Sequence, residues 1–493
     1  MQKYVILKKI IFEGDNMTDL SKVYFGCSDA NTEAERNPTK FKKVFFDPHN
    51  YMEELIFGDK FILCGRKGDG KTSYGAQIFL NADDNNIYAY QKSLNNFNNI
   101  TFSKIKTYDS LGGNPYISFW KCILMIECMG MIDNYEPSIQ TNEYVNVLSA
   151  LYDKGLLSKD SDISTTVSKL IESDSTINVK SVFKHARKHS YYEELHGAEQ
   201  IYTTIKNSIQ NIYLKKRFVL IVDGLDDILN STEFKSDIIS GLIRAVDEIN
   251  KIFKKETLSI KILILIRNDV LNLCRDPNLS KIIRDSGIRL SWTITDDPCD
   301  SDLIKLVEKR INEAAENNKS FTQAWSEWFP EIVGTRPSLD YVLDNIIYRP
   351  RDILQFFLEA QKDFIPGRKI TPEKLNSILA RYSDEYFVDA MRDELTGFFP
   401  NDAVTLLPNI LSKMGTRYFY LSDFEKECKK HKEFDNIQID SLLKSLFDSG
   451  YIGQHRPREN QDFTVFSYRN QRETFHEDHE CILHRGLTRA LTI

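Results

Sequence analysis

The stretch Phe61-Ile62-Leu63-Cys64-Gly65-Arg66-Lys67-Gly68-Asp69-Gly70-Lys71-Thr72-Ser73 indicates how this chain folds. Residues 61–64 form a short apolar run typical of a buried strand, and residues 74–80 have a helical pattern. Between them the motif G-x-x-x-x-G-K-[ST] runs from Gly65 to Thr72. Strand, glycine-rich loop and helix in this order are typical of a phosphate-binding loop (P-loop). The alternative is a glycine-rich turn that matches by chance, and the flanking elements argue against it.

The loop has the chemistry that a nucleotide needs. Its glycines would let successive backbone N–H groups turn toward phosphate oxygens, beside the positive end of the following helix. Lys71 is expected to reach the β- and γ-phosphates and Thr72 to ligate magnesium. We therefore predict ATP and Mg²⁺ as ligands. The predicted nucleotide-binding residues are Gly65, Arg66, Lys67, Gly68, Asp69, Gly70, Lys71, Thr72 and Ser73.

Composition narrows the protein class. The chain has 493 residues, of which 41% are hydrophobic and 27% charged, as in ordinary globular proteins of about three domains. No apolar run is long enough to span a bilayer, so we expect no membrane partner. With 64 basic and 71 acidic residues, the net charge of -7 offers no overall attraction to nucleic acid. The eight cysteines lack CxxC pairs and are expected to be reduced, which favours a cytoplasmic protein.

The domain organisation follows from shifts in pattern along the chain. Residues 1–16 are predicted to be an over-extended N-terminus, because the codons for residues 13–16 can be back-translated to a ribosome-binding site before Met17. The other predicted parts are an N-terminal segment (17–57) packed beside the first strand, an ATPase core (58–300) with a helical insertion at about 133–200, a helical lid (301–383) and a winged-helix-like domain (384–493).

A second nucleotide feature is the apolar run 218–222, which ends in Asp223-Gly224-Leu225-Asp226-Asp227. A continuous Val/Ile/Leu run indicates a strand buried on both faces, as in a parallel sheet covered by helices. Asp223 would hold the magnesium, and Asp226 or Asp227 would polarise the attacking water. The alternative is a buried strand that is followed by an acidic turn.

Two arginines are expected to read the γ-phosphate. Arg267 follows the buried strand 260–266, and its planar donor fork suits phosphate oxygens. A surface arginine that caps the strand is the alternative. Arg351 opens a helix of the lid and could couple hydrolysis to lid movement, whereas Arg349 is the weaker candidate.

Arg284 ends a helical stretch just before the predicted strand 287–293. In ring-forming ATPases a subunit offers an arginine from this place to its neighbour's nucleotide. A solvated cation near the negative end of the helix dipole is the interpretation that we favour.

The C-terminal part has the order helix, helix, helix, wing. The predicted helices span 390–398, 404–414, 421–431 and 439–449, and a strand follows at 463–468. This order is typical of a winged-helix domain. Helix 439–449 carries Asp440, Lys444 and Asp448, so it has no net positive charge that would attract the phosphates of DNA. Protein contact or autoinhibition is therefore favoured over DNA binding.

These residues together resemble a known family. GRKGDGKT, the strand ending in DGLDD, the strand ending in IRND, the RPRD step and the winged helix are similar to bacterial P-loop ATPases of the AAA+/STAND type found beside phage-defence genes. The DGLDD ending resembles that of NACHT-like signalling ATPases. The resemblance covers most of residues 24–493. It implies an α/β core with a lid, Mg-ATP, homo-oligomerisation or switching on ATP binding, and an effector protein encoded nearby.

The chain departs from this family in one respect. No superstructure-forming repeats follow the winged helix, so the sensor is expected in the helical insertion or in another protein. The function predicted from these observations is a Mg-ATP-hydrolysing switch, an ATPase that regulates an effector in anti-phage defence. One alternative is a DNA-dependent ATPase that resembles replication initiators. The other is a nucleotide-gated scaffold with little hydrolysis.

Overall fold

The computed structural model of this protein describes residues 18–94, 115–137, 139, 141–158, 163, 166, 170, 197–210, 212–225, 235–274, 276–293, 295, 297–314, 318–456, 463–470 and 473–493. The predicted over-extended terminus, 1–16, lies outside these residues. So do Asp226 and Asp227, the predicted water-activating carboxylates.

A five-stranded parallel sheet forms the first half of the molecule, in the order β2-β3-β4-β1-β5. The strands are β1 (Ile62–Gly65), β2 (Ile87–Ser93), β3 (Arg217–Asp223), β4 (Ile260–Arg267) and β5 (Gly287–Arg289). Residues 218–222 of β3 are completely buried, as the apolar run predicted. The predicted α/β class, a parallel sheet packed with helices, is confirmed. The fifth strand is shorter than predicted, because it pairs with β1 only as far as Arg289.

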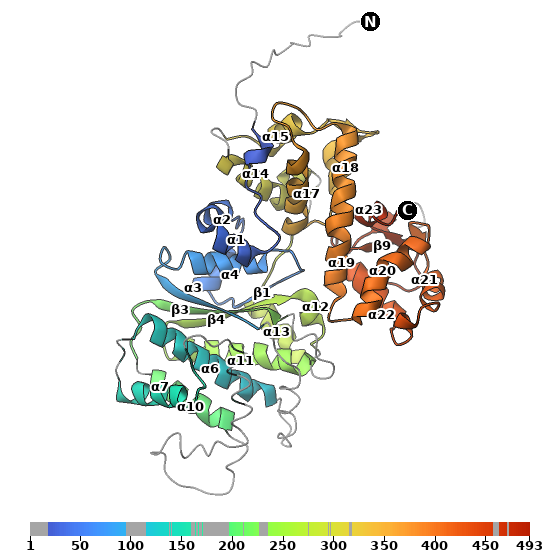
Figure 1. Cartoon of the computed structure of the whole chain (residues 1–493). Helices are drawn as coiled ribbons and strands as arrows, with labels where there is room; N and C mark the ends of the chain where they lie inside the picture. The colour runs from blue at the N-terminus through green and yellow to red at the C-terminus, as the bar shows by residue number, and fades with distance from the viewer. Residues whose placement is uncertain are drawn as a thin grey trace, which may run out of the picture.

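Helices cover both faces of this sheet (Figure 1). On one face lie α4 (Lys71–Leu80) and the N-terminal helices α1 (Ala30–Arg36), α2 (Pro38–Val44) and α3 (Tyr51–Phe57). On the other lie α6 (Pro115–Tyr135), α7 (Asn142–Asp153), α10 (Gly197–Ile209) and α11 (Lys235–Lys255). The Trp120 indole of α6 donates to the carbonyl of Ile238 in α11 at 3.0 Å, which ties the two long helices together. The short helices α12 (Asn268–Asn272) and α13 (Pro277–Ser286) follow β4.

A helical region begins after the sheet and has its own aromatic core. Its first elements are η4 (Pro298–Asp300), α14 (Asp302–Ala314), α15 (Phe321–Trp328), the hairpin β6 (Ile332–Val333) and β7 (Arg336–Pro337), α16 (Ser338–Leu343), α17 (Pro350–Asp363) and α18 (Pro372–Tyr382). The N-terminal segment joins this core on both sides of η1 (Leu20–Lys22). Before η1 the carbonyl of Thr18 accepts the Trp328 indole N–H, and after it the ring of Phe25 stacks on Phe357 at 4.7 Å. Residues 18–57 thus bridge the sheet and the helical region, whereas the prediction packed them beside the first strand alone.

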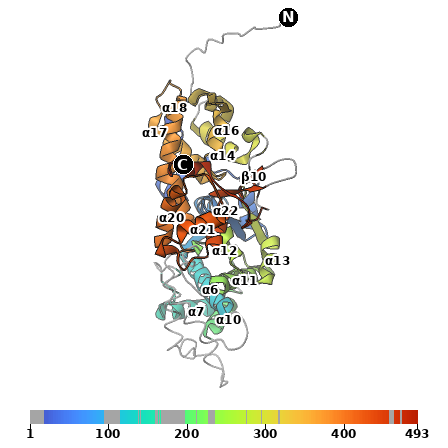
Figure 2. The same ribbon diagram turned by 90° about the vertical axis from the view of Figure 1, so that its right-hand side faces the viewer.

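The predicted boundary at residue 383/384 falls inside one continuous helix. The π-helical turn η5 (Ser383–Phe387) joins α18 to α19 (Val388–Leu395) without a break. One hydrophobic cluster contains residues from both sides of this point, among them Leu379 and Met391. Both views place this region beside the edge of the sheet that carries α12 and α13 (Figures 1 and 2).

The chain ends in a second, antiparallel sheet with the order β10-β9-β11-β8. Its strands are β8 (Tyr418–Phe419), β9 (Ile452–Arg456), β10 (Phe463–Val465) and β11 (Cys481–Leu483). The helices around it are α20 (Asn401–Lys413), α21 (Leu421–Cys428), η6 (Lys432–Phe434), α22 (Ile439–Ser449) and α23 (Arg485–Thr488). Among the described helices, none combines the length and apolar character needed to cross a membrane.

His484 lies buried in the core of this C-terminal part, with 1% of its surface exposed. Its Nδ1 accepts the backbone N–H of Gly486 at 3.0 Å, so the proton of the neutral ring is on Nε2, which faces the Tyr468 hydroxyl at 3.0 Å. Burial, followed by the positive field of Arg469, lowers the pKa of His484 to about 3. The folded chain therefore holds His484 neutral.

We predict that acid weakens the C-terminal part through His484. Because its folded pKa lies below the ordinary value, the unfolded chain binds more protons between about pH 6.5 and 3, and stability falls as the pH falls through this window. At pH 4.5 the loss relative to pH 7.5 is roughly 2 to 3 kcal/mol. Denaturant unfolding at both pH values measures it. His484→Gln should lose less stability on acidification than the wild type, and equal losses would contradict the prediction.

Candidate functional site

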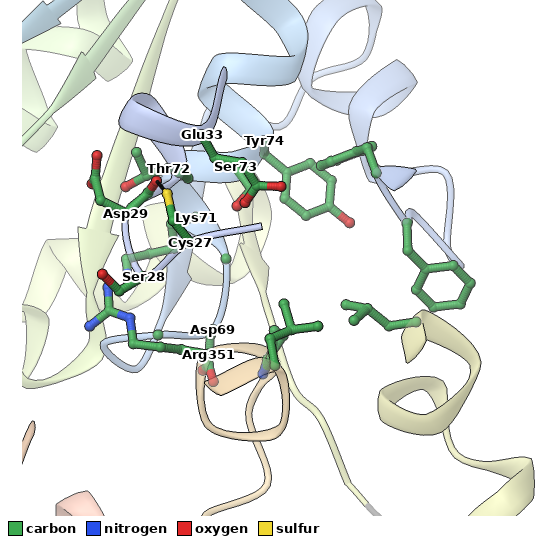
Figure 3. A pocket seen from close by; sticks show the side chains of 18 of the residues that line it. Cys27, Ser28, Asp29, Glu33, Asp69, Lys71, Thr72, Ser73, Tyr74 and Arg351 are labelled. Atoms are coloured by element: carbon green, nitrogen blue, oxygen red, sulfur yellow. Dashed lines mark hydrogen bonds between the residues drawn. The ribbon is translucent and has the colours of Figure 1, made fainter. Parts of the chain in front are cut away.

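The glycine-rich loop opens a pocket at the start of α4. Gly68 has φ 86° and Gly70 has φ 96°, a left-handed conformation that glycine adopts without strain. Gly70 caps α4 without a side-chain hydrogen bond, and the first-turn N–H groups have no partner within the helix. Residues 67–73 all line the pocket (Figure 3). The positive end of the helix therefore faces a space that an anion could fill.

The shape of the loop is held from inside and from the helical region. Asp69 is completely buried and accepts the backbone N–H of Arg66 at 2.6 Å. Its backbone carbonyl accepts the Trp292 indole N–H at 2.9 Å. The Arg66 guanidinium donates to the carbonyl of Tyr348 at 2.8 Å. Arg66 and Asp69 thus fix the shape of the loop. Of the residues predicted to bind nucleotide, Asp69 lines the pocket, whereas Gly65 and Arg66 do not.

Lys71, the predicted phosphate lysine, is folded back onto the loop. Its Nζ donates to the carbonyls of Gly65 at 3.1 Å and Arg66 at 2.8 Å. Its side chain lines the pocket together with Thr72 and Ser73 (Figure 3). A phosphate in the pocket would compete with these two carbonyls for the ammonium group.

The two predicted magnesium ligands, Thr72 and Asp223, line the same pocket. Asp223 ends β3, and its Oδ1 accepts the N–H of Gly224 at 2.8 Å. Because β4 lies between β1 and β3, the tip of β4 separates the glycine-rich loop from Asp223. Arg267 occupies that tip, in register with Gly65.

Arg267 is 4% exposed, so it is not the surface cap considered as an alternative. It lines the pocket, and its guanidinium donates to Asp269 at 2.9 Å and to Glu394 of α19 at 2.8 Å. Glu394 also accepts Nη1 of Arg349 at 2.7 Å. Sequence reasoning missed Glu394, since no local pattern connects it to a strand tip 127 residues away.

The start of α17 lies directly on the glycine-rich loop. The backbone N–H of Arg351 donates to the carbonyl of Gly68 at 3.3 Å, and the Arg351 side chain extends beside the pocket (Figure 3). Arg349, the weaker candidate, is buried: it donates to the carbonyl of Lys67 at 3.0 Å and to the Tyr451 hydroxyl at 2.9 Å. It also pairs with Asp352. Arg349 thus braces the loop, and Arg351 is the arginine of α17 at the pocket.

Arg284 does not line the pocket of its own chain. It stands in the last turn of α13 with a side chain that is 76% exposed, and its ion-pair partner is the neighbouring Asp285. This exposed helix-end position is what the favoured interpretation described.

The opposite wall of the pocket comes from the N-terminal segment, to which the sequence assigned no chemistry. Its lining residues are Cys27, Ser28, Asp29, Ala30, Glu33, Phe41, Val44, Phe45 and Phe46. Cys27 donates its thiol to the carbonyl of Asp29 at 3.1 Å (Figure 3). Glu33 forms a buried ion pair with Arg310 of α14 at 3.4 Å, and burial raises the pKa of this carboxyl. The aromatic run 41–46 shortly before β1 is the signal that could have indicated this wall.

Both signs of charge line the pocket. Its cations are Lys67, Lys71, Arg267, Arg310 and Arg351, and its carboxylates are Asp29, Glu33, Asp69 and Asp223. Burial lowers the pKa of Lys67, although Glu394 and Asp393 oppose the shift. Lys67 and Lys71 belong to the loop that leads into the positive end of α4, so this end of the pocket is the one that suits an anion.

Comparison with known proteins points first to a class of helical domain. Residues 301–391 match the model of the FunZ-associated C-terminal helical domain. The match includes α17 and the first half of α19, and it crosses the predicted boundary at 383/384.

The chain is also distantly related to the putative transposon gamma-delta 80.3 kDa protein of Escherichia coli (strain K12). The two are 21% identical over 458 residues, which are 86% of this chain. The chain spans 61% of the length of that relative.

We predict that Gly68→Ala loosens the contact between the loop and α17. A Cβ at Gly68 would lie 3.1 Å from Cβ of Arg351 and 3.3 Å from Cδ of Arg349, in addition to its positive φ. Gly367→Ala is the matched control, because Gly367 also has a positive φ but no atom within 4 Å of its Cβ position. Denaturant unfolding should show a loss of about 1 kcal/mol for the control and roughly 2 to 4 kcal/mol for Gly68→Ala. Equal losses would show that the close contact is unimportant.

Proposed function

We propose that this chain is a P-loop ATPase of the AAA+/STAND type, a switch driven by Mg-ATP. The observation that carries the proposal is the pocket at the start of α4. The glycine-rich loop, Asp223 from β3, Arg267 from β4 and Arg351 from α17 all line it. These are the groups that bind, neutralise and sense the phosphates of a nucleotide.

The residues present fit ATP. No atom lies within 4 Å of the Cβ position of Gly70, so the cradle above the helix start has room for phosphate oxygens. Further from the loop the pocket is lined by apolar side chains of the N-terminal segment, α14 and α17, including Phe41, Leu306, Leu354 and Leu358. An apolar wall of this kind suits a purine base.

Mg²⁺ also fits the oxygen donors of Thr72 and Asp223. Bound there, it would neutralise the charge of the phosphates. The residues proposed to orient the attacking water, Asp226 and Asp227, follow Leu225 in the sequence and lie outside the described part of the chain. Arg267 and Arg351 are proposed to read the γ-phosphate.

The region after the sheet supports the switch. We interpret 301–383 as a lid, because the first turn of α17 rests on the loop. We interpret the C-terminal helices and antiparallel sheet as winged-helix-like. Arg267, Glu394, Arg349 and Asp352 form one buried chain of ion pairs from the strand tip to α19 and α17, and Asp269, which is 38% exposed, joins it at Arg267.

Glu394 is the centre of this network and is ionised. Although burial opposes the charge, Arg267 and Arg349 hold the pKa of Glu394 below its ordinary value. A γ-phosphate would be a further anion for Arg267, beside the carboxylates of Asp269 and Glu394. Nucleotide state would therefore decide which anion Arg267 binds, and α19 would move with Glu394.

The wider biology is proposed from the resemblance. An effector encoded nearby, a role in anti-phage defence and ATP-dependent homo-oligomers with Arg284 as a finger in trans all belong to this proposal. The second candidate is a DNA-dependent ATPase. It is favoured by the relationship to a protein of a transposon, which is a DNA element.

We predict that Lys71→Ala weakens ATP binding by roughly 100-fold, because a charged hydrogen-bond donor to the phosphates is lost. Asp227→Asn should bind ATP without turnover. Calorimetry and phosphate release measure the two effects. Lys254→Ala is the matched control, since this lysine side chain is 72% exposed and pairs with Asp59. Full turnover by both site variants would refute the ATPase.

We predict that Glu394→Gln shifts the nucleotide preference toward ATP. Without the Glu394 carboxylate, Arg267 loses one of its two carboxylate partners and keeps Asp269. A γ-phosphate can take the place of Glu394, so the ratio of affinity for a non-hydrolysable ATP analogue to that for ADP should rise about tenfold. The variant should also lose stability, because a buried pair is broken.

Asp352→Asn is the control for this network. It breaks a buried pair of Arg349 but leaves the contact between Arg267 and Glu394 in place. Its nucleotide preference should stay as in the wild type. If both variants shift the preference equally, Glu394 has only a structural role.

A further inference from the structure

Five arginines gather on the surface of the helical C-terminal region, away from the pocket at α4. They come from β7, from the residue before β8, from the segment after β10, and from α23 and the residue after it: Arg336, Arg417, Arg469, Arg485 and Arg489. Three of them share one carboxylate, Asp344. The Arg469 guanidinium lies 3.1 Å from this carboxylate and that of Arg485 lies 3.8 Å from it.

The other two arginines extend the same surface. Arg417 donates to the carbonyl of Leu483 at 2.8 Å, immediately before α23. Arg489 donates to Asn376 at 3.0 Å and reaches the hydroxyl of Tyr341, one turn before Asp344. Arg336, Arg417, Arg469 and Arg485 thus cluster around Asp344, and Arg489 lies beside Tyr341, one helical turn before it.

The cluster has more positive charge than its acids compensate. Asp340 lies in the first turn of α16 and Asp344 ends the helix, and Arg336, Arg469 and Arg485 all pair with Asp344. The side chains of Arg336, Arg469 and Arg485 are 38%, 44% and 43% exposed. Burial lowers the pKa of Arg417, and the nearby charge of Arg485 adds to the shift. This excess stands out in a chain whose net charge is -7.

Exposed aromatic rings continue the surface beside Arg417. Tyr418 and Tyr420 are 46% and 48% exposed, and alternate residues of an extended strand share one face. The Arg417 guanidinium lies 5.9 Å from the centre of the Tyr418 ring. Asp423, the next carboxylate along the chain, pairs with Lys426. β8 is an edge strand of its sheet, so the rings lie at an open margin of the described structure.

Arginines beside exposed tyrosines match the needs of a single-stranded nucleic acid. The guanidinium groups pair with phosphates, and the rings stack on unpaired bases irrespective of sequence. A duplex would meet the arginines but would leave the rings without bases to stack on. An acidic protein would pair with the arginines without needing two neighbouring flat rings.

We propose that single-stranded nucleic acid binds to the arginine–tyrosine surface, formed by Arg336, Arg417, Tyr418, Tyr420, Arg469 and Arg485. This site differs from α22, the helix that the sequence suggested as a DNA reader, whose charges include Asp440 and Asp448. It is also separate from the nucleotide pocket. The proposal therefore stands or falls independently of ATP hydrolysis.

Fluorescence anisotropy of the full chain with a labelled thymidine oligonucleotide of about 20 nucleotides tests the proposal. Four arginine–phosphate contacts predict a slope of about -2.8 in log affinity against log salt, or roughly a 50-fold loss between about 50 and about 200 mM salt. Arg336→Gln with Arg485→Gln should lower the steepness of this slope by about 1.4. Lys71→Ala should bind the oligonucleotide as the wild type does, which separates this test from that of the ATPase.

Tyr418→Ala with Tyr420→Ala should weaken binding at least fivefold and leave the salt slope unchanged, because stacking is lost and charge is not. Lys254→Gln is the control, an exposed cation of α11 outside the surface. Circular dichroism confirms that the variants fold. The proposal is overturned if the oligonucleotide does not bind at low salt, if the surface variants bind as tightly as the control, or if a duplex of equal length or polyglutamate binds more tightly.

Discussion

The structure depends on one buried carboxylate that binds two arginines at once. Glu394 lies between Arg267 at the tip of β4 and Arg349 at the start of α17, at 2.8 and 2.7 Å. A carboxylate in this place is costly to bury alone, and two guanidinium groups offset the cost only while all three elements remain together. Glu394 therefore joins the sheet, α17 and α19 at one point, beside the contacts that Arg66, Arg349 and Trp292 make with the loop.

The same requirement explains why the pocket combines parts that are distant in sequence. Arg66 of the loop donates a hydrogen bond to the carbonyl of Tyr348, and the carbonyl of Lys67 accepts one from Arg349. Trp292 fixes the loop from a third direction. The phosphate cradle is thus shaped by the helical region as well as by its own glycines, and a change in the helical region would be felt at the loop.

Much of the sheet could be predicted from sequence because its signals are local. The run 218–222 and the motif from Gly65 to Thr72 each specify an element within a few residues, and both elements are present. β5 ends at Arg289, earlier than the predicted strand 287–293, because the length of a strand depends on its pairing with β1. The wall formed by residues 27–46 and the pairing of Glu394 with Arg267 were not predictable. Both are contacts between segments far apart in the chain, and no periodicity encodes them.

The helix from Pro372 to Leu395 has a mechanical consequence. At 1.5 Å per residue this rod is about 36 Å long, so a tilt of 5° at one end displaces the other by about 3 Å. Glu394 stands at one end of the rod. Near its middle, in the π turn, Ser383 accepts the N–H of Ala490 and so fastens the rod to the last residues of the chain. The rod would act as a lever with its pivot at Ser383. If the Glu394 end moved by one ångström relative to Arg267, the Pro372 end would move by a comparable distance, far from the pocket.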